Sequence, residues 1–191
     1  ALTDAGARML ERAQPLLDQL EDVHAEVAAF DGAVTGTVRL ACFPSFGKRY
    51  VIPALENLPV AHPGLHVELD TTERRADPVL DRLDAVIRIG HLADSTLIAT
   101  KLADQTRLLV ASQHYLDRYG EPATPDQLRQ HRLIDKLHGN DLLGWADILG
   151  QRLVERSDIK PVLRCDDFEA MRLAARSGMG IALLPDWVVG P

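Results

Sequence analysis

The chain has 191 residues, of which 46% are hydrophobic and 26% charged, and this balance of a packed protein excludes intrinsic disorder. Its 21 basic and 28 acidic residues give a net charge of −7, the wrong sign for a surface that grips a phosphate backbone, so these residues alone are not expected to bind DNA. Cys42 and Cys165 form neither a CxxC pair nor a Cys/His group, which predicts two reduced core thiols.

Membrane insertion and export are also not indicated. No apolar run approaches the roughly 18 residues that a bilayer span requires. Residues 1–12 lack the basic-then-apolar order of a signal peptide. We therefore expect a soluble, cytoplasmic protein.

Residues 3–30 favour one long helix, because helix-forming residues dominate the segment and Asp31-Gly32 supplies a stop signal. At 1.5 Å per residue this helix would be about 42 Å long, more than an ordinary globular helix. Its acidic residues predict a solvated face. Apolar residues recur in steps of three and four, as in a coiled-coil seam, at Leu10, Ala13, Leu17, Leu20 and, further on, Val27. We expect residues 1–32 to be a dimerisation helix.

The next segment alternates strand and helix. Strands are predicted at residues 37–43, 65–69 and 84–89, with helices at 47–58 and 76–83. This order implies a parallel sheet with helices on its faces, and so an α/β fold.

A second block follows the same alternation and makes a second lobe plausible, with residues 99–103 as the crossing. Its predicted elements are a strand at 107–112, a helix at 113–119, a helix opened by Thr124-Pro125, a strand at 132–135, a surface excursion with Trp145 at 141–149, a hairpin-like pair at 151–158 and 159–165, a helix capped by Asp166-Asp167 and ended by Gly178, and a strand at 180–184.

No pattern points to catalysis. The GxSxG, GxGxxG, GxxxxGK[ST] and HExxH signatures are absent, so we expect no enzyme and no cofactor. His62 and His66 have the spacing of a metal pair on a helix, but Pro63-Gly64 between them forbids that helix, so no metal is expected.

The positions that follow predicted strands are more informative, because ligands of open α/β sheets bind beyond the carboxyl ends of the strands. Ser45 follows the first strand, and its hydroxyl could cap the next helix, leave N–H groups free for a carboxylate, or do both. Thr71 and Thr72 follow the second strand and could donate to the same ligand or be ordinary turn residues.

Arg88 and Gly90 close the third predicted strand. The Arg88 guanidinium could fork onto a carboxylate, and Gly90 would let a ligand approach the backbone. An ion pair between Arg88 and a nearby acid such as Asp94 is the alternative.

Six phrases occur in order along the chain: LTDAG (2–6), TGTVRLACFPSFGKRYVIPAL (35–55), HPGLHVELD (62–70), DAVIRIG (84–90), LLVASQHYL (108–116) and SGMGIALLPDWVV (177–189). Each phrase alone is a weak pattern, but their order and spacing together are specific. Over nearly all 191 residues the chain resembles the LysR-type transcriptional regulators.

The resemblance implies a linker helix followed by a two-lobed α/β regulatory domain similar to type 2 periplasmic binding proteins. It places lobe I at residues 33–99 and lobe II at 100–191, with a small effector, expected to be an organic acid, between them. The effector-binding positions it implies are Ser45, Phe46, Thr71, Thr72, Arg88 and Gly90.

The resemblance also implies partners. DNA would be read by a winged helix-turn-helix of which only the trailing LTDAG lies in these residues, and a further strand and helix would return to complete lobe I. Self-association as a homodimer or homotetramer is expected. A solute-binding protein for transport is the alternative, disfavoured by the seam and the missing export signal; a hydrolase using Ser45 lacks an evident histidine partner.

Overall fold

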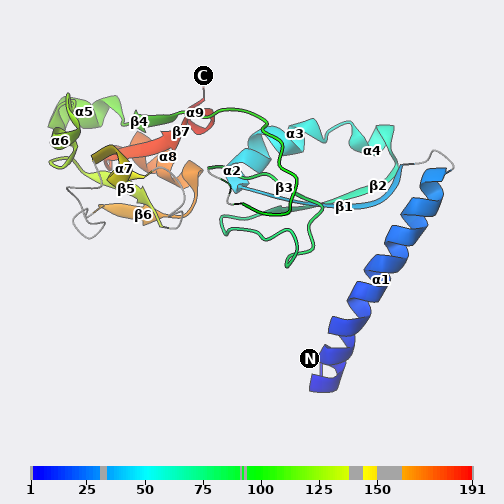
Figure 1. The fold of residues 1–191 in the computed structure, drawn as a ribbon. Coiled ribbons are helices and arrows are strands. Elements are labelled where there is room, and N and C mark those ends of the chain that lie inside the picture. The colour runs from blue at the N-terminus through cyan, green and yellow to red at the C-terminus, as the bar shows by residue number, and fades with distance from the viewer. Residues whose placement is uncertain are drawn as a thin grey trace. The chain divides into compact units, whose positions relative to one another are not determined.

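The computed structural model of the chain describes residues 2–30, 34–90, 92, 94–137, 144–149 and 161–190. Two compact units make up the chain. The first comprises residues 1–42 and 47–87, and the second comprises residues 43–46 and 88–191. Each unit contains a sheet and helices, and each is described by itself below (Figure 1).

The first unit begins with a helix of 27 residues, α1 (Asp4–Phe30), which confirms the long helix predicted from the sequence. The side-chain oxygen of Thr3 accepts a hydrogen bond from the Gly6 N–H at 3.2 Å and so satisfies one free donor of the first turn. The seam positions Leu10, Leu17, Leu20 and Val27 are 52–61% exposed in the single chain. Their packing against another chain stays a prediction.

Three parallel strands form the sheet of the first unit in the order β2-β1-β3. β1 (Thr35–Cys42) pairs with β2 (Gly64–Thr71) from Thr35 opposite Gly64 to Cys42 opposite Thr71. β3 (Ala85–Val86) is shorter than the predicted strand at 84–89. Because all three strands run the same way, their carboxyl ends meet at one edge of the sheet.

The helix predicted at 47–58 is wrong in both its start and its continuity. Helical structure begins at Pro44 with α2 (Pro44–Phe46) and continues as a π-helical segment (Gly47–Val51), α3 (Ile52–Ala54) and, after a turn, α4 (Leu58–Ala61). Proline lacks an N–H, so it is tolerated in a first helical turn but interrupts a longer helix. Pro53 and Pro59 stand in the first turns of α3 and α4 and divide the segment.

The helix predicted at 76–83 is also wrong, because the structure has turns there. The Asp77 side chain accepts hydrogen bonds from the N–H groups of Val79 and Leu80, at 2.9 and 3.0 Å. Arg82 has a φ of 52°, in the left-handed region. The Asp77 bonds are those of a helix N-cap and begin one helical turn, which the left-handed φ of Arg82 then ends.

The sheet of the second unit is mixed, with the order β4-β7-β5-β6. Its strands are β4 (Arg107–Val110), β5 (Leu133–Lys136), β6 (Leu163–Cys165) and β7 (Ile181–Pro185). β5 is parallel to both neighbours, whereas β4 runs antiparallel to β7. β6 therefore pairs with β5; residues 151–158, its predicted hairpin partner, lie outside the described residues.

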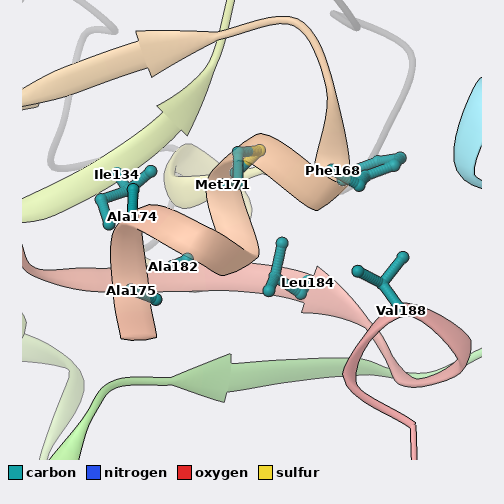
Figure 2. Packing of buried hydrophobic residues seen from close by; sticks show 8 residues of the cluster. All are labelled: Ile134, Phe168, Met171, Ala174, Ala175, Ala182, Leu184 and Val188. Atoms are coloured by element: carbon teal, nitrogen blue, oxygen red, sulfur yellow. The ribbon is translucent and has the colours of Figure 1, made fainter. Parts of the chain in front are cut away.

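Alternate residues of β7 enter two cores, one on each face of this sheet. Ile181 and Leu183 pack with Tyr115 of α5 (Gln113–Tyr119), Leu128 of α6 (Pro125–Leu128) and Trp145 of α7 (Trp145–Leu149). Ala182 and Leu184 pack with α8 (Phe168–Arg176) and α9 (Asp186–Val189). Figure 2 shows the second core, with Phe168 at one end of it, in the first turn of α8. Burial on both faces explains why β7 is apolar throughout.

Trp145 corrects the surface excursion predicted at 141–149, of which residues 141–143 lie outside the described residues. The residue begins α7, is only 3% exposed, and donates its indole N–H to the Ile134 carbonyl at 3.0 Å. A large aromatic side chain can be buried there because its single polar group has a partner.

The cap predicted for the helix over 168–177 is confirmed for Asp167. Its side chain accepts a hydrogen bond from the Ala170 N–H at 3.0 Å, and α8 ends at Arg176, two residues before Gly178, whose φ is 80°. Such a cap contributes about 1 kcal/mol to helix stability.

Gly180→Ala tests the close packing of β7 against the start of β5. A Cβ at Gly180 would lie 2.3 Å from the Arg132 carbonyl oxygen, whereas one at Gly120 would meet nothing within 4 Å. We expect Gly180→Ala to lower the free energy of unfolding in urea by about 3 kcal/mol. Gly120→Ala, strained only by its backbone (φ 82°, ψ 167°), should cost about 1–2 kcal/mol; a cost for Gly180→Ala no larger than this would contradict the steric account.

Candidate functional site

The carboxyl edge of the first sheet holds Thr71 and Thr72. Thr71 lies opposite Cys42 in the strand register, and the Thr72 N–H donates to the Cys42 carbonyl at 3.0 Å. The Thr72 hydroxyl accepts a hydrogen bond from the Arg74 N–H at 3.2 Å, which is the ordinary turn role. That role uses the oxygen as an acceptor and leaves the hydroxyl hydrogen available to a ligand.

Gly47 lets the chain after β1 pass close to this edge. A Cβ on Gly47 would lie 2.8 Å from the Cys42 sulfur and 3.0 Å from the Thr71 methyl carbon. Both distances are shorter than normal carbon contacts, so the position accepts no larger residue without movement of its neighbours. Thr71 and Cys42 are thereby held against the beginning of the π-helical segment.

Ser45 and Phe46, between these two parts of the first unit in the sequence, belong to the second unit. Ser45 is 2% exposed, and its side-chain oxygen has no hydrogen-bond partner within the described part of the chain. The predicted capping role is therefore not observed: α2 already begins at Pro44. Leaving a buried hydroxyl unpaired costs roughly 1–3 kcal/mol, so this oxygen is suited to a ligand.

Aromatic rings near Ser45 in the sequence pack against α8 and α9. The Phe43 and Phe168 ring centroids are 6.2 Å apart, and the Phe46 ring meets Trp187 edge to face at 5.4 Å. Trp187 also meets Phe168 edge to face, at 6.1 Å. Phe43 and Phe46, which bracket Pro44 and Ser45 in the sequence, thus contact the first turns of α8 and α9.

Two cations lie against the Phe168 ring. The guanidinium carbon of Arg107 is 4.9 Å from the ring centroid, and the Lys136 ammonium is 4.8 Å from it. Lys136 donates to the Asp166 carbonyl at 2.8 Å and lies 3.4 Å from the Asp166 carboxylate. Burial lowers the pKa of Arg107 to about 10, an effect that the negative charge of Asp186 opposes.

Sequence reasoning missed Arg107 and Lys136, because each is a single basic residue at one end of a short strand. Nothing local distinguishes either from a solvated charge. Phe168, which brings them together, is 61 and 32 positions away from them along the chain. Only the packing of α8 on the sheet reveals the pair.

Arg88 and Gly90, the remaining predicted positions, follow β3. Arg88 already has an interaction within the described structure, so a ligand carboxylate would have to share or replace it. Gly90 has a φ of 103°, which an L side chain rarely adopts, so the turn after Arg88 needs glycine. Bidentate binding of a ligand carboxylate by Arg88 stays a prediction.

Neither cysteine has the environment of a reactive thiol. Burial raises the pKa of the Cys42 thiol, and the Asp70 carboxylate raises it further. Burial and then Asp167 raise the pKa of Cys165. A raised pKa disfavours the nucleophilic thiolate. In the part of the chain that the structure describes, no group of His, Cys, Asp and Glu could hold a metal ion.

A polar cavity of about 300 Å³ in the first unit is lined mainly by charged residues. These charges are paired with one another: Arg74 lies 2.6 Å from the Asp81 carboxylate and 3.4 Å from Asp70, and Arg39 lies 3.0 Å from Glu68. Each of these five charged side chains therefore has an ion-pair partner within the cavity wall.

None of the described helices is long and apolar enough to cross a bilayer.

Two α/β units and a long N-terminal helix define the class of the protein, a regulatory domain of the LysR type. CrgA, a LysR-type transcriptional regulator from Neisseria meningitidis, matches 99% of this chain with a TM-score of 0.70 and 25% identity, over 64% of its own chain. An HTH-type transcriptional regulator of Haemophilus influenzae is 27% identical over 190 residues, covering 98% of this chain and 65% of its own length. One of Xanthomonas campestris pv. campestris is 28% identical over 195 residues, covering 100% and 56%.

The chain belongs to the LysR substrate binding domain family, whose model matches residues 31–191. This confirms the resemblance and the two-lobed α/β fold predicted from the sequence. The relatives named above are transcription regulators. The chain spans about 65% or less of the length of these curated relatives.

The two cations on Phe168 predict opposite effects of the same substitution. Arg107→Met removes buried donors whose lack of partners costs roughly 1–3 kcal/mol each, against a ring contact worth about 0.5–2 kcal/mol. We expect it to raise the free energy of unfolding by about 1 kcal/mol. Lys136→Met removes the ammonium that donates to the Asp166 carbonyl and should lower the free energy of unfolding by about 2 kcal/mol. Urea denaturation of both variants measures this; a loss of stability in Arg107→Met would contradict the unpaired guanidinium.

Proposed function

We propose that this chain is the linker and effector-sensing part of a LysR-type transcription regulator, and that its effector is a small organic acid. The buried Ser45 hydroxyl carries the proposal, because it has no protein partner within the described residues and lies in a domain whose family binds substrates. Hydroxyl donors and a guanidinium suit a carboxylate.

The effector-binding residues in this proposal are those that follow the strands of the first sheet. The Ser45 hydroxyl and the free hydroxyl hydrogen of Thr72 would donate to the ligand, Phe46 would contact its apolar body, and Arg88 would share its charge. Thr71 and Gly90 would shape the approach. Support comes from the parallel strands, whose carboxyl ends meet at one edge.

Regulation in this proposal requires no bond to be made or broken. The effector binds one arrangement of the two units more tightly than another, and the population shifts toward it. An effector with equal affinity for both arrangements would shift nothing. DNA would be read by a part of the protein outside these residues, in the cytoplasm, and the α1 seam would join the subunits into a dimer or tetramer.

Ser45→Ala is expected to weaken effector binding about tenfold without lowering the thermal midpoint, because the buried hydroxyl bonds no group in the described part of the chain. Ser112→Ala is the matched control, since that serine accepts a hydrogen bond from the Tyr115 N–H at 3.2 Å as the N-cap of α5. It should cost about 1 kcal/mol of stability and no affinity. Equal loss of stability in Ser45→Ala would assign Ser45 to structure.

A thermal-shift screen of small acids identifies the effector for this measurement. At 100 times its Kd, the effector should raise the free energy of unfolding by about 2.7 kcal/mol.

Leu17→Glu is expected to dissociate the oligomer, because it places a charge in the apolar seam of α1, where Leu17 is 55% exposed in the single chain. Gln19→Glu adds the same charge outside the seam and should leave the assembly intact. Light scattering measures both masses. An unchanged mass for Leu17→Glu would contradict the proposal that the α1 seam joins the subunits.

A further inference from the structure

The Arg107 guanidinium has an unusual pattern of unpaired atoms. Its Nε and Nη2 atoms are buried, and neither has a hydrogen-bond partner in the part of the chain that the structure describes. These two atoms lie on the same edge of the planar guanidinium. Their N–H bonds run nearly parallel, which is the geometry that grips both oxygens of one carboxylate.

The acids near Arg107 do not use this edge. Asp186 is the residue whose negative charge acts on Arg107, yet its carboxylate accepts hydrogen bonds from the Thr106 N–H at 3.1 Å and the Trp187 N–H at 2.8 Å. Those bonds hold it at the junction of β7 and α9. The charge of Arg107 is thus compensated by Asp186, while the Nε and Nη2 donors have no partner among the described residues.

Aromatic rings bound the same place. The guanidinium lies over the Phe168 ring, and Trp187 meets Phe168 edge to face. Lys136 brings a second positive charge to the Phe168 ring. Positive charge and aromatic surface together suit a ligand with an anionic group on a small apolar body.

We propose that Arg107 binds the carboxylate of a small monocarboxylic acid through Nε and Nη2, with the half-buried Trp187 ring against the apolar part of the acid. The proposal rests on the proposed function, since this acid would be the effector, and it assigns the charged contact to Arg107 in place of the Arg88 predicted from the sequence. Lys136 is a supporting charge, because Asp166 already holds its ammonium.

Calorimetric titration of the full chain with phenylacetate tests the proposal, with the neutral phenylacetamide as a matched ligand. We expect saturable phenylacetate binding and at least tenfold weaker phenylacetamide binding. Arg107→Met should weaken phenylacetate binding at least tenfold, and Arg107→Lys, which keeps the charge without the paired donors, several-fold. Arg118→Met removes an exposed guanidinium 5.5 Å from the Tyr119 ring and should change nothing.

The pH dependence supplies a second measurement. Only the protonated guanidinium binds a carboxylate, and the pKa of Arg107 is about 10. Affinity should therefore be constant from pH 7 to 9, and an affinity that already falls within this range would overturn the proposal. So would the absence of saturable phenylacetate binding, or full binding by Arg107→Met. If another acid from the thermal-shift screen binds and Arg107→Met binds it equally, only this inference fails. If no acid binds at all, the proposed function fails as well.

Discussion

The second unit depends on β7, a strand of five residues buried along its whole length. Because its side chains alternate between two faces, one strand supplies both cores and holds helices on each side of the sheet. The chain leaves β7 at Pro185 and enters α9 at once, so Asp186 and Trp187 have little freedom of position. The ring contacts of Trp187 with Phe46 and Phe168 are built on that junction.

Phe168 shows how one buried ring can organise a charged site. Two cations approach it at nearly the same distance, 4.8 and 4.9 Å, yet their surroundings differ. Lys136 is satisfied by Asp166, while two donors of Arg107 have no partner in the described residues. Burial of an unpaired guanidinium opposes folding, and a buried polar group left without a partner is a candidate for a functional role.

Sequence reasoning succeeded where the pattern is local or repeated. Composition predicts the long helix, and alternating apolar and polar residues predict the three parallel strands. A side chain beside a helix start predicts the Asp167 cap, and six ordered phrases predict the family. It failed where a local feature interrupted the periodic pattern of apolar residues. The left-handed Arg82 ends the helical turn at 76–83, and prolines divide the segment after Pro44. It also missed that the Ile134 carbonyl gives the Trp145 indole a partner in the core.

The sequence by itself determined the class of the protein, because strands, helix stops and the six ordered phrases are written in neighbouring residues. Tertiary structure alone decided which polar groups are buried without a partner. Ser45 loses its expected capping role because helical structure already begins at Pro44, so that Ser45 lies inside the helix and not before it. Arg107 acquires its unpaired edge because α8 and α9 bring Phe168 and Trp187 together from distant parts of the chain. Pairing and burial are properties of three-dimensional neighbours, which no run of adjacent residues specifies.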